Sequence, residues 1–378
     1  MTDLSNAAGG GIAADTVDTV DTVDTVDTGD TGAGSGFPSA LPLPRTPDPL
    51  SAPALRWGVV APGGIADHFV RAAHRFTRQR FVAAASRSAE RADRFAQAHG
   101  IDRGYGSYDE LYDDPDVQVV YVASPHSEHH AQALRAVQAG KSVLVEKSFT
   151  RNAAEAAELV AAARAAGVTL VEAMWTRFLP HTDVARQLLA DGTLGDVRTV
   201  LADHGAWFDP ATAERLFAPE LAGGALLDLG VYPVSFASFV LGAPDAVHAT
   251  GRLTNTGVDA EISAVLRTGS AVAVLHTTLA AATPTTASVS GSLARMEFGE
   301  PFYSPTSLTL VHRDGRRLVL PAPGGAHKDG LAYEAAHMAS LVADGAPESP
   351  LLPLAESQQV MATMDTLRRQ VGVTYPGE

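Results

Sequence analysis

The chain has 378 residues, 46% of them hydrophobic, which is enough for two domains, and its lack of cysteine excludes disulfides and thiolate metal sites and favours a reducing, cytoplasmic location. Its net charge of −15 argues against a nucleic-acid partner, because phosphate contacts need clustered Lys and Arg. The apolar runs are short and interrupted by charges, so we expect neither a membrane span nor a signal peptide.

The first 54 residues differ in composition from the rest of the chain. Eight Asp and one Arg give residues 1–54 a charge of −7, and Asp-Thr-Val repeats from Asp15 to Asp30 before a Pro-rich stretch. A three-residue period matches neither a strand nor a helix, so it forms no consistent apolar face. We therefore expect residues 1–54 to be a disordered, low-complexity tail.

Residues 55–175 alternate apolar strands with helical patterns, from "LRWGVV" to "VTLVEAM". This alternation predicts an α/β fold with a doubly wound parallel sheet, a Rossmann domain. Such sheets bind ligands at the carboxyl ends of their strands. The strand "SVLVE" ends there in Glu146 and Lys147, so we expect both charges to face a ligand rather than the core.

Residues 176–378 show a different pattern. Helical stretches around 182–191 and 224–241 are followed by alternating segments such as "AEISAVLRTG" and "AVAVLHTTLA". These segments predict a mostly antiparallel open sheet with one face exposed or covered by a partner. Two helical patterns close the chain, so we expect an α+β domain.

The first turn of the predicted Rossmann domain reads "GVVAPGGIA". A dinucleotide fingerprint has Gly-x-Gly-x-x-Gly or Ala, because pyrophosphate approaches the backbone closely there. The corresponding positions are Ala61, Gly63 and Ala66, with Gly64 adding conformational freedom. Taken alone, this stretch is explained equally well as an ordinary Gly-rich turn.

The second strand ends in "AASRSAERA", about 20 residues beyond the glycines, where the adenine ribose lies in such folds. An acidic residue there would bind the 2′-hydroxyl of NAD. Ser86, Arg87 and Ser88 instead suit a 2′-phosphate, which predicts NADP and makes NAD the less favoured cofactor. The alternative is that Arg87 is a solvated surface residue.

Two further stretches carry polar groups near predicted strand or helix ends. In "SPHSEHH", His126 and His129 are three residues apart, but no acidic or Cys partner is suitably placed, so we expect no metal site. In "GGALLDLGVYP", Asp228 and Tyr232 are four residues apart on one helical face. A buried Asp needs a partner, and the ammonium of Lys147 is a candidate.

With "EKS", "EAMWTRF" and "GGALLDLGVYP" in view, residues 55–378 resemble the Gfo/Idh/MocA oxidoreductase family. The resemblance is greatest to the branch of dimeric dihydrodiol dehydrogenases and NADP-dependent D-xylose 1-dehydrogenases, and it extends through "GYGSYDEL", "GTLGDVR", "SVSGS" and "GVTYP". It implies a Rossmann domain, a C-terminal open sheet, and a homodimer formed through that sheet.

The resemblance also implies roles for individual residues. Lys147, Tyr232 and Asp228 match the catalytic lysine, the catalytic tyrosine and the acidic residue one turn earlier. Ala61 and Ser148 depart from the family pattern, where Gly and Pro are found. The implied cofactor contacts are Gly63, Gly64, Ile65, Ser86, Arg87, Ser124, His126, His129, Glu146, Lys147, Trp175 and Arg177.

Hydride transfer from an alcohol requires a base on the hydroxyl oxygen. We expect the ammonium of Lys147 to lower the pKa of Tyr232 towards neutrality, and either Glu146 or Asp228 to orient Lys147. The predicted enzyme is an NADP-dependent oxidoreductase acting on a small molecule, either a sugar or a vicinal diol. An aromatic diol would stack on Trp175, Trp207 or Phe208.

Two alternatives belong to other classes. A non-catalytic NADP-binding sensor or regulator would retain the Rossmann domain without the catalytic trio, and a structural oligomer would leave the site at Arg87 without a purpose. The joint presence of Lys147, Asp228 and Tyr232 favours the enzyme over both.

Overall fold

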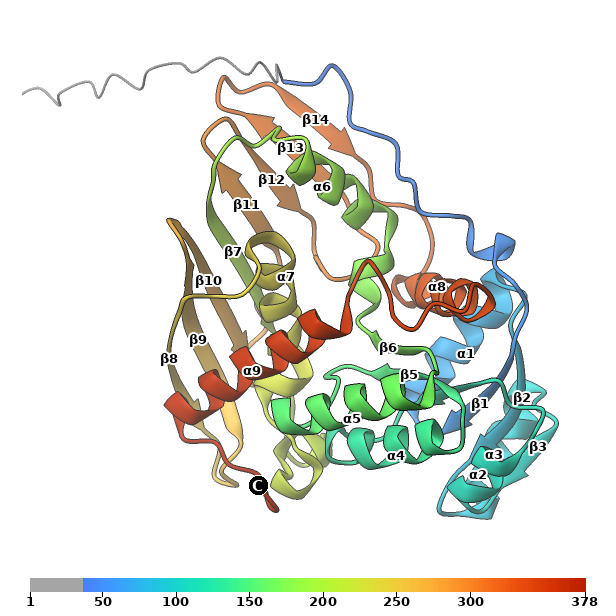
Figure 1. Cartoon of the computed structure of the whole chain (residues 1–378). Coiled ribbons are helices and arrows are strands. Elements are labelled where there is room, and N and C mark those ends of the chain that lie inside the picture. The colour runs from blue at the N-terminus through green and yellow to red at the C-terminus, as the bar shows by residue number, and fades with distance from the viewer. Residues whose placement is uncertain (1–36) are drawn as a thin grey trace, which may run out of the picture. The chain divides into compact units, whose positions relative to one another are not determined.

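The computed structural model describes residues 37–378, which contain two β-sheets with surrounding helices (Figure 1). The first sheet has six parallel strands in the order β3-β2-β1-β4-β5-β6. Because the order reverses between β1 and β4, this is where ligands bind in such sheets, at the carboxyl ends of the strands. The strands are β1 (Arg56–Val60), β2 (Arg80–Ala85), β3 (Arg103–Tyr105), β4 (Val119–Val122), β5 (Ser142–Glu146) and β6 (Leu170–Ala173).

Five helices connect these strands, and several end at capping residues. Ser88 and Asn152 accept backbone hydrogen bonds at the starts of α2 and α5, and Gly100 and Gly167 end the same helices in the left-handed conformation. The predicted doubly wound sheet is confirmed, although β3 was missed because three residues carry no periodic pattern. The helices are α1 (Gly64–Phe76), α2 (Ala89–His99), α3 (Tyr108–Asp113), α4 (His126–Gln138) and α5 (Ala153–Ala166).

The second sheet has eight strands in the order β14-β13-β12-β11-β7-β10-β9-β8, all antiparallel except the pair β7 and β10. Helices α7 and α9 pack against this sheet, while α8 contacts α1 and α9 contacts α5. The predicted α+β domain is therefore confirmed. Its strands are β7 (Val197–Gly205), β8 (Ala246–Leu253), β9 (Asp259–Thr268), β10 (Ala271–Thr278), β11 (Ala287–Gly291), β12 (Ala294–Phe298), β13 (Leu308–His312) and β14 (Arg317–Leu320). Its helices are α6 (Pro180–Ala190), α7 (Val231–Leu241), α8 (Leu331–Ala343) and α9 (Leu354–Val371).

The face of the second sheet that points away from the core carries apolar side chains. Leu201, Val274 and Val265 are 49%, 44% and 43% exposed. Val274 lies directly opposite Leu201 on one neighbouring strand and Val265 on the other, so the three form a row across β7, β10 and β9. We call this row, Leu201, Val265 and Val274, the apolar row.

One segment reaches the length and composition of a membrane span, contrary to the expectation from the sequence. Pro219–Leu241 qualifies on both counts, and 78% of its most apolar window is buried inside the protein. A core helix of a soluble protein passes the same test. The segment includes η5 (Leu226–Gly230), a π-helical turn that leads directly into α7.

The prediction of a tail ending at residue 54 was wrong for residues 37–54. Residues 1–36, with the Asp-Thr-Val repeat, lie outside the described part of the chain. Phe37 packs beside the ring of His312, with 4.9 Å between centroids, and the backbone N–H and guanidinium of Arg45 donate to Asp183 at 2.7 and 2.9 Å. Composition does not predict that residues 37–54 pack on the second domain, because Asp183, the partner of Arg45, lies 138 residues further along the chain.

Candidate active site

A cleft of about 840 Å³ lies at the carboxyl ends of the first sheet's strands. Turns after β1, β2, β4 and β5 form one side, and β7, η5 and α7 contribute to the other. Most residues predicted from the sequence line this cleft. They are Gly63, Gly64, Ile65, Ser86, Arg87, Ser124, His126, His129, Glu146, Lys147, Asp228 and Tyr232.

The β1–α1 turn leaves room for a ligand beside the backbone. A Cβ atom on Gly64 would meet no atom within 4 Å, and one on Gly63 would only reach a carbonyl oxygen at 3.9 Å. Ala61 has φ +59°, the left-handed conformation that glycine adopts more readily, which explains why the fingerprint has Gly there. Ser124 lines the same cleft, and its hydroxyl is buried without a hydrogen-bond partner. These features fit a dinucleotide, whose phosphates accept hydrogen bonds from such groups.

The β2–α2 turn forms the cationic end of the cleft. Arg87 is exposed and lines it, together with Arg91 of α2. Ser88 is occupied as the N-cap of α2, because its hydroxyl accepts from the backbone N–H of Arg91 at 3.3 Å. The Ser86 hydroxyl accepts from the N–H of Ser88, also at 3.3 Å. Arg87 is thus left as a charged group that faces the cleft beside a second cation.

The two histidines after β4 hold turns together. His129 lies 2.8 Å from the carbonyl oxygens of both Ser124 and Ser148, and His126 lies 3.1 Å from that of Ala222. Burial lowers the pKa of His129 to about 4 and that of His126 to about 3. Both rings are therefore neutral at pH 7, and His129 donates to one of its two carbonyls.

Lys147 reaches across the cleft to the second domain. Its Nζ donates to the backbone carbonyl of Asp228 at 2.7 Å and lies 3.6 Å from a carboxylate oxygen of the same residue. Glu146 instead accepts from the Tyr121 hydroxyl and from the backbone N–H of Lys147. Of the two carboxylates considered from the sequence, Asp228 is therefore the one that holds the ammonium.

Ser148, which replaces the family's proline, adds a contact of its own. Its hydroxyl donates to the carbonyl of Leu227 at 2.7 Å, and the Lys147–Ser148 peptide is cis. Leu227 belongs to η5, so the Ser148 hydroxyl ties the residue after Lys147 to the turn that carries Asp228.

The Asp228 carboxylate is ionised despite its burial. Burial acts to raise its pKa, but Lys147 and Arg215 outweigh this and hold the pKa well below the usual range. The guanidinium of Arg215 lies 3.0 Å from the carboxylate. The Asp228 carboxylate therefore forms ion pairs with two cations, and its negative charge is shared between Lys147 and Arg215.

Tyr232 differs from the expectation that a neighbouring ammonium would lower its pKa. The Nζ of Lys147 lies 5.3 Å from the centre of the Tyr232 ring. Burial nevertheless raises the pKa well above 10, and Glu146 adds to this increase. Trp175 Nε1 donates to the Tyr232 hydroxyl at 3.1 Å. The phenol is thus protonated at neutral pH, and its own proton is available to a group in the cleft.

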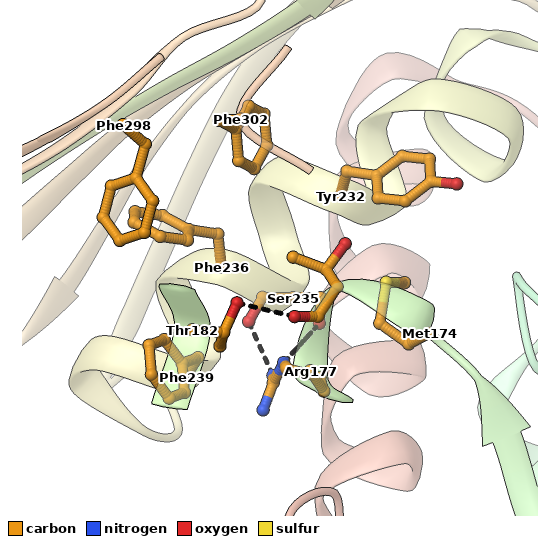
Figure 2. A pocket seen from close by; sticks show the side chains of 10 residues that line it. Met174, Arg177, Thr182, Tyr232, Ser235, Phe236, Phe239, Phe298 and Phe302 are labelled. Carbon is orange, nitrogen blue, oxygen red and sulfur yellow. Dashed lines mark hydrogen bonds between the residues drawn. The ribbon is translucent and has the colours of Figure 1, made fainter. Parts of the chain in front are cut away.

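Arg177 is not brought to the cleft, so its prediction as a cofactor contact was wrong. It is 2% exposed and binds Ser235 and the carboxylate of Glu356. Figure 2 shows its guanidinium directed at Ser235 in a separate small pocket lined by phenylalanines, while the Tyr232 hydroxyl points away from it. Trp175 is also buried outside the cleft lining, and it acts through its hydrogen bond to Tyr232.

Several cleft residues were not predicted from the sequence. Tyr303 stacks on Tyr232 with 4.3 Å between ring centres, and His204 packs against Tyr303 at 4.6 Å. Arg215 and Lys328 add positive charge, and none of these four residues stands in a motif. Of the aromatic residues proposed to stack on a diol, Phe208 lines the cleft.

Trp207, by contrast, is 65% exposed and absent from the cleft lining. Both residues follow β7, which ends at Gly205, and only the side chain of Phe208 is directed into the cleft. Only Phe208 of this adjacent pair is positioned to contact a ligand.

Comparisons with known proteins identify the family. Residues 55–174 match the oxidoreductase family with an NAD-binding Rossmann fold, and residues 182–297 match the GFO/IDH/MocA C-terminal domain. The chain is 39% identical over 331 residues to trans-1,2-dihydrobenzene-1,2-diol dehydrogenase of Macaca fascicularis, covering 85% of this chain and 98% of that one. The Homo sapiens enzyme of the same name is 38% identical with the same coverage.

Solved structures with a similar fold are also known. A 3-ketoreductase from Actinomadura kijaniata, in complex with NADP and TDP-benzene, has a TM-score of 0.74 at 27% identity and covers 84% of this chain and 98% of its own. Aldose-aldose oxidoreductase from Caulobacter crescentus, complexed with glycerol, has a TM-score of 0.75 at 26% identity and covers 85% and 98%. The chain is therefore an enzyme of the Gfo/Idh/MocA oxidoreductase family.

Proposed function

We propose that this enzyme uses NADP to transfer a hydride to or from a hydroxyl-bearing carbon of a sugar or a vicinal diol. The observation that carries the proposal is the single cleft with Arg87 at one end and Lys147, Asp228 and Tyr232 at the other. The dihydrodiol dehydrogenases and the aldose-aldose oxidoreductase among the similar proteins support both substrate classes.

The chemistry of the reacting end follows from three side chains. When bound, the nicotinamide supplies the carbon that gives or takes the hydride. Tyr232 holds the proton that moves to or from the substrate oxygen, because its phenol is protonated at neutral pH. The ammonium of Lys147 stabilises negative charge on that oxygen, and Asp228 fixes the ammonium in place.

Arg87 provides the test of the cofactor assignment. NADPH should bind the wild-type protein more tightly than NADH, measured by titration of tryptophan fluorescence. Arg87→Ala should weaken NADPH binding about tenfold or more, because a charge-assisted contact to a 2′-phosphate is lost, and should change NADH binding much less.

Arg94→Ala is the matched control, since Arg94 is an exposed residue of α2 that does not line the cleft. Equal affinity for the two cofactors would overturn the preference for NADP. Binding of neither cofactor would overturn the proposed function itself.

We also propose that the enzyme is a homodimer that pairs through the outer face of the second sheet. The apolar row crosses β7, β10 and β9, the fifth to seventh of the eight strands, and is open to solvent in a single chain. Exposed apolar groups that adjoin one another on a sheet face are typical of an interface. Arg267 and Glu261 flank Val265 two and four residues away on the same strand, so the face carries both charges and is suited to pairing with a second copy.

A further inference from the structure

Lys328 brings a second ammonium to the reacting end of the cleft. It lies in η6 (His327–Gly330) and lines the cleft together with Lys147 and Tyr232. Its Nζ is 5.2 Å from the centre of the Trp175 ring, and Trp175 in turn donates to the Tyr232 hydroxyl. Lys328 is thus connected to the reacting hydroxyl through a single indole.

This ammonium has no partner of its own within residues 37–378. No hydrogen bond or ion pair involves its Nζ among these residues. Its Nζ instead makes a cation–π contact with the Trp175 ring. Glu146 is committed to Tyr121 and to the backbone of Lys147, and burial raises the pKa of Glu334 well above its usual range. Burial and Lys147 lower the pKa of Lys328, and this outweighs the opposite effect of the more distant carboxylates of Glu146, Glu334 and Asp228.

The charges around the substrate position are positive in sum. Lys147 and Arg215 share the Asp228 carboxylate, and Lys328 adds a further cation. The whole lining has five cationic side chains against three acidic ones, Glu128, Glu146 and Asp228, while burial lowers the pKa of His204 to about 4 and leaves that ring neutral. The chain as a whole carries −15 and contains only three lysines, of which two line this cleft. A positive site in an acidic protein selects for an anionic ligand.

We propose that Lys328 binds the carboxylate of a sugar acid, so that the preferred substrate is a uronic acid rather than a neutral sugar or an aromatic diol. This inference rests on the proposed function, because it assigns the substrate of the same cleft. A single ammonium neutralises the one negative charge of a carboxylate, whereas a phosphate monoester carries about 1.5 to 2 negative charges at pH 7. Lys328 and Tyr232 both contact the Trp175 indole and both line the cleft, so one sugar ring can present its carboxylate to the ammonium and its reacting hydroxyl to the phenol.

The sharpest test compares D-galacturonate with D-galactose, which differ only at C6. Calorimetric titration of the NADP⁺-saturated enzyme should show at least tenfold tighter binding of the uronate. Lys328→Met should abolish that difference, and Lys328→Arg should keep most of it. Arg94→Met, which removes an exposed charge outside the cleft, should leave it unchanged, and thermal melting of each variant verifies folding.

Equal affinity for the two sugars, or a preference that survives Lys328→Met, would overturn the carboxylate site. Tighter binding of D-galactose 6-phosphate than of the uronate would also overturn it in favour of a phosphate. NADPH formation, followed in parallel, separates the two proposals. Turnover of galactose with no preference for the uronate removes the carboxylate site alone, whereas Lys328-dependent uronate binding with no turnover of any sugar or diol removes the proposed function alone.

Discussion

Tyr232 is the residue at which burial and a nearby cation compete. A lysine beside a tyrosine predicts a lowered pKa from the sequence, but desolvation of a fully enclosed phenolate costs more than an ammonium 5.3 Å from the ring centre recovers. The side chain is therefore best suited to donate a proton in the direction of reduction. The hydrogen bond from Trp175 Nε1 holds the phenol oxygen in place.

Tyr232→Phe should lower turnover at least about a hundredfold, because it removes the only proton carried at that position. The affinity for NADPH should change little, since Phe keeps the ring that stacks on Tyr303. Steady-state kinetics with a fluorescence titration of NADPH measures both quantities. A loss of only a few-fold in turnover would remove Tyr232 from the proposed role.

The raised pKa of Tyr232 also predicts how the rate depends on pH. Oxidation of an alcohol needs the phenolate, which is scarce at neutral pH, so kcat/KM for oxidation should rise about tenfold per pH unit between pH 7 and 9. Reduction uses the protonated phenol and should stay nearly constant over that range. An oxidation rate that is already level at pH 7 would contradict a protonated resting state.

At the scale of elements, the β5 end and the η5 turn bring the catalytic groups together. Ser148 donates to the carbonyl of Leu227, and Asp259 of β9 accepts from the N–H of Leu226 at 2.6 Å. Gly224 is required beside Asp259, since it has φ +114° and a Cβ there would lie 2.2 Å from the carboxylate. A π-helical turn of this kind is common at functional sites, because it redirects side chains within a helix.

Asp259 makes stability depend on pH in a defined direction. Burial raises its pKa to about 6, above the value near 3.9 of an unfolded chain, so the folded state binds the proton more tightly. Its contribution to stability is present below about pH 4 and is lost as the pH rises to about 6. Asp259→Asn keeps an oxygen for Leu226 and should therefore gain about 2 to 3 kcal/mol relative to wild type between pH 4 and pH 7.

Urea unfolding at both pH values measures this difference. Asp102→Asn, at an exposed position, is the control and should follow the wild type. A difference between Asp259→Asn and wild type that does not vary with pH would show that Asp259 is ionised alike in both states.

At the scale of the whole molecule, the outer face of the second sheet determines the assembly we propose. Val274→Glu should place a charge at the centre of the apolar row, opposite Leu201 and Val265, and convert the dimer to a monomer. Light scattering coupled to gel filtration measures the mass. Leu50→Glu, an exposed apolar position outside the second sheet, is the control and should leave the dimer intact. A wild-type mass of one chain would contradict the assignment.

The two kinds of sheet and much of the cleft could be predicted from the sequence alone. Strand and helix periodicities are local, so the parallel and antiparallel patterns were readable directly. The position of Lys147 at a strand end and the four-residue spacing of Asp228 and Tyr232 were readable in the same way, and the structure brings these three residues together.

Which polar groups are buried, and which partners they find, depends on the tertiary fold. Arg45 meets Asp183 across 138 residues, and Arg177 turns to Glu356 across 179 rather than to the cleft. The same dependence explains Lys328, which reaches the reacting end only because η6 packs near α1. Burial and long-range pairing set charge states and side-chain direction, and neither quantity is encoded in the spacing of residues along the chain.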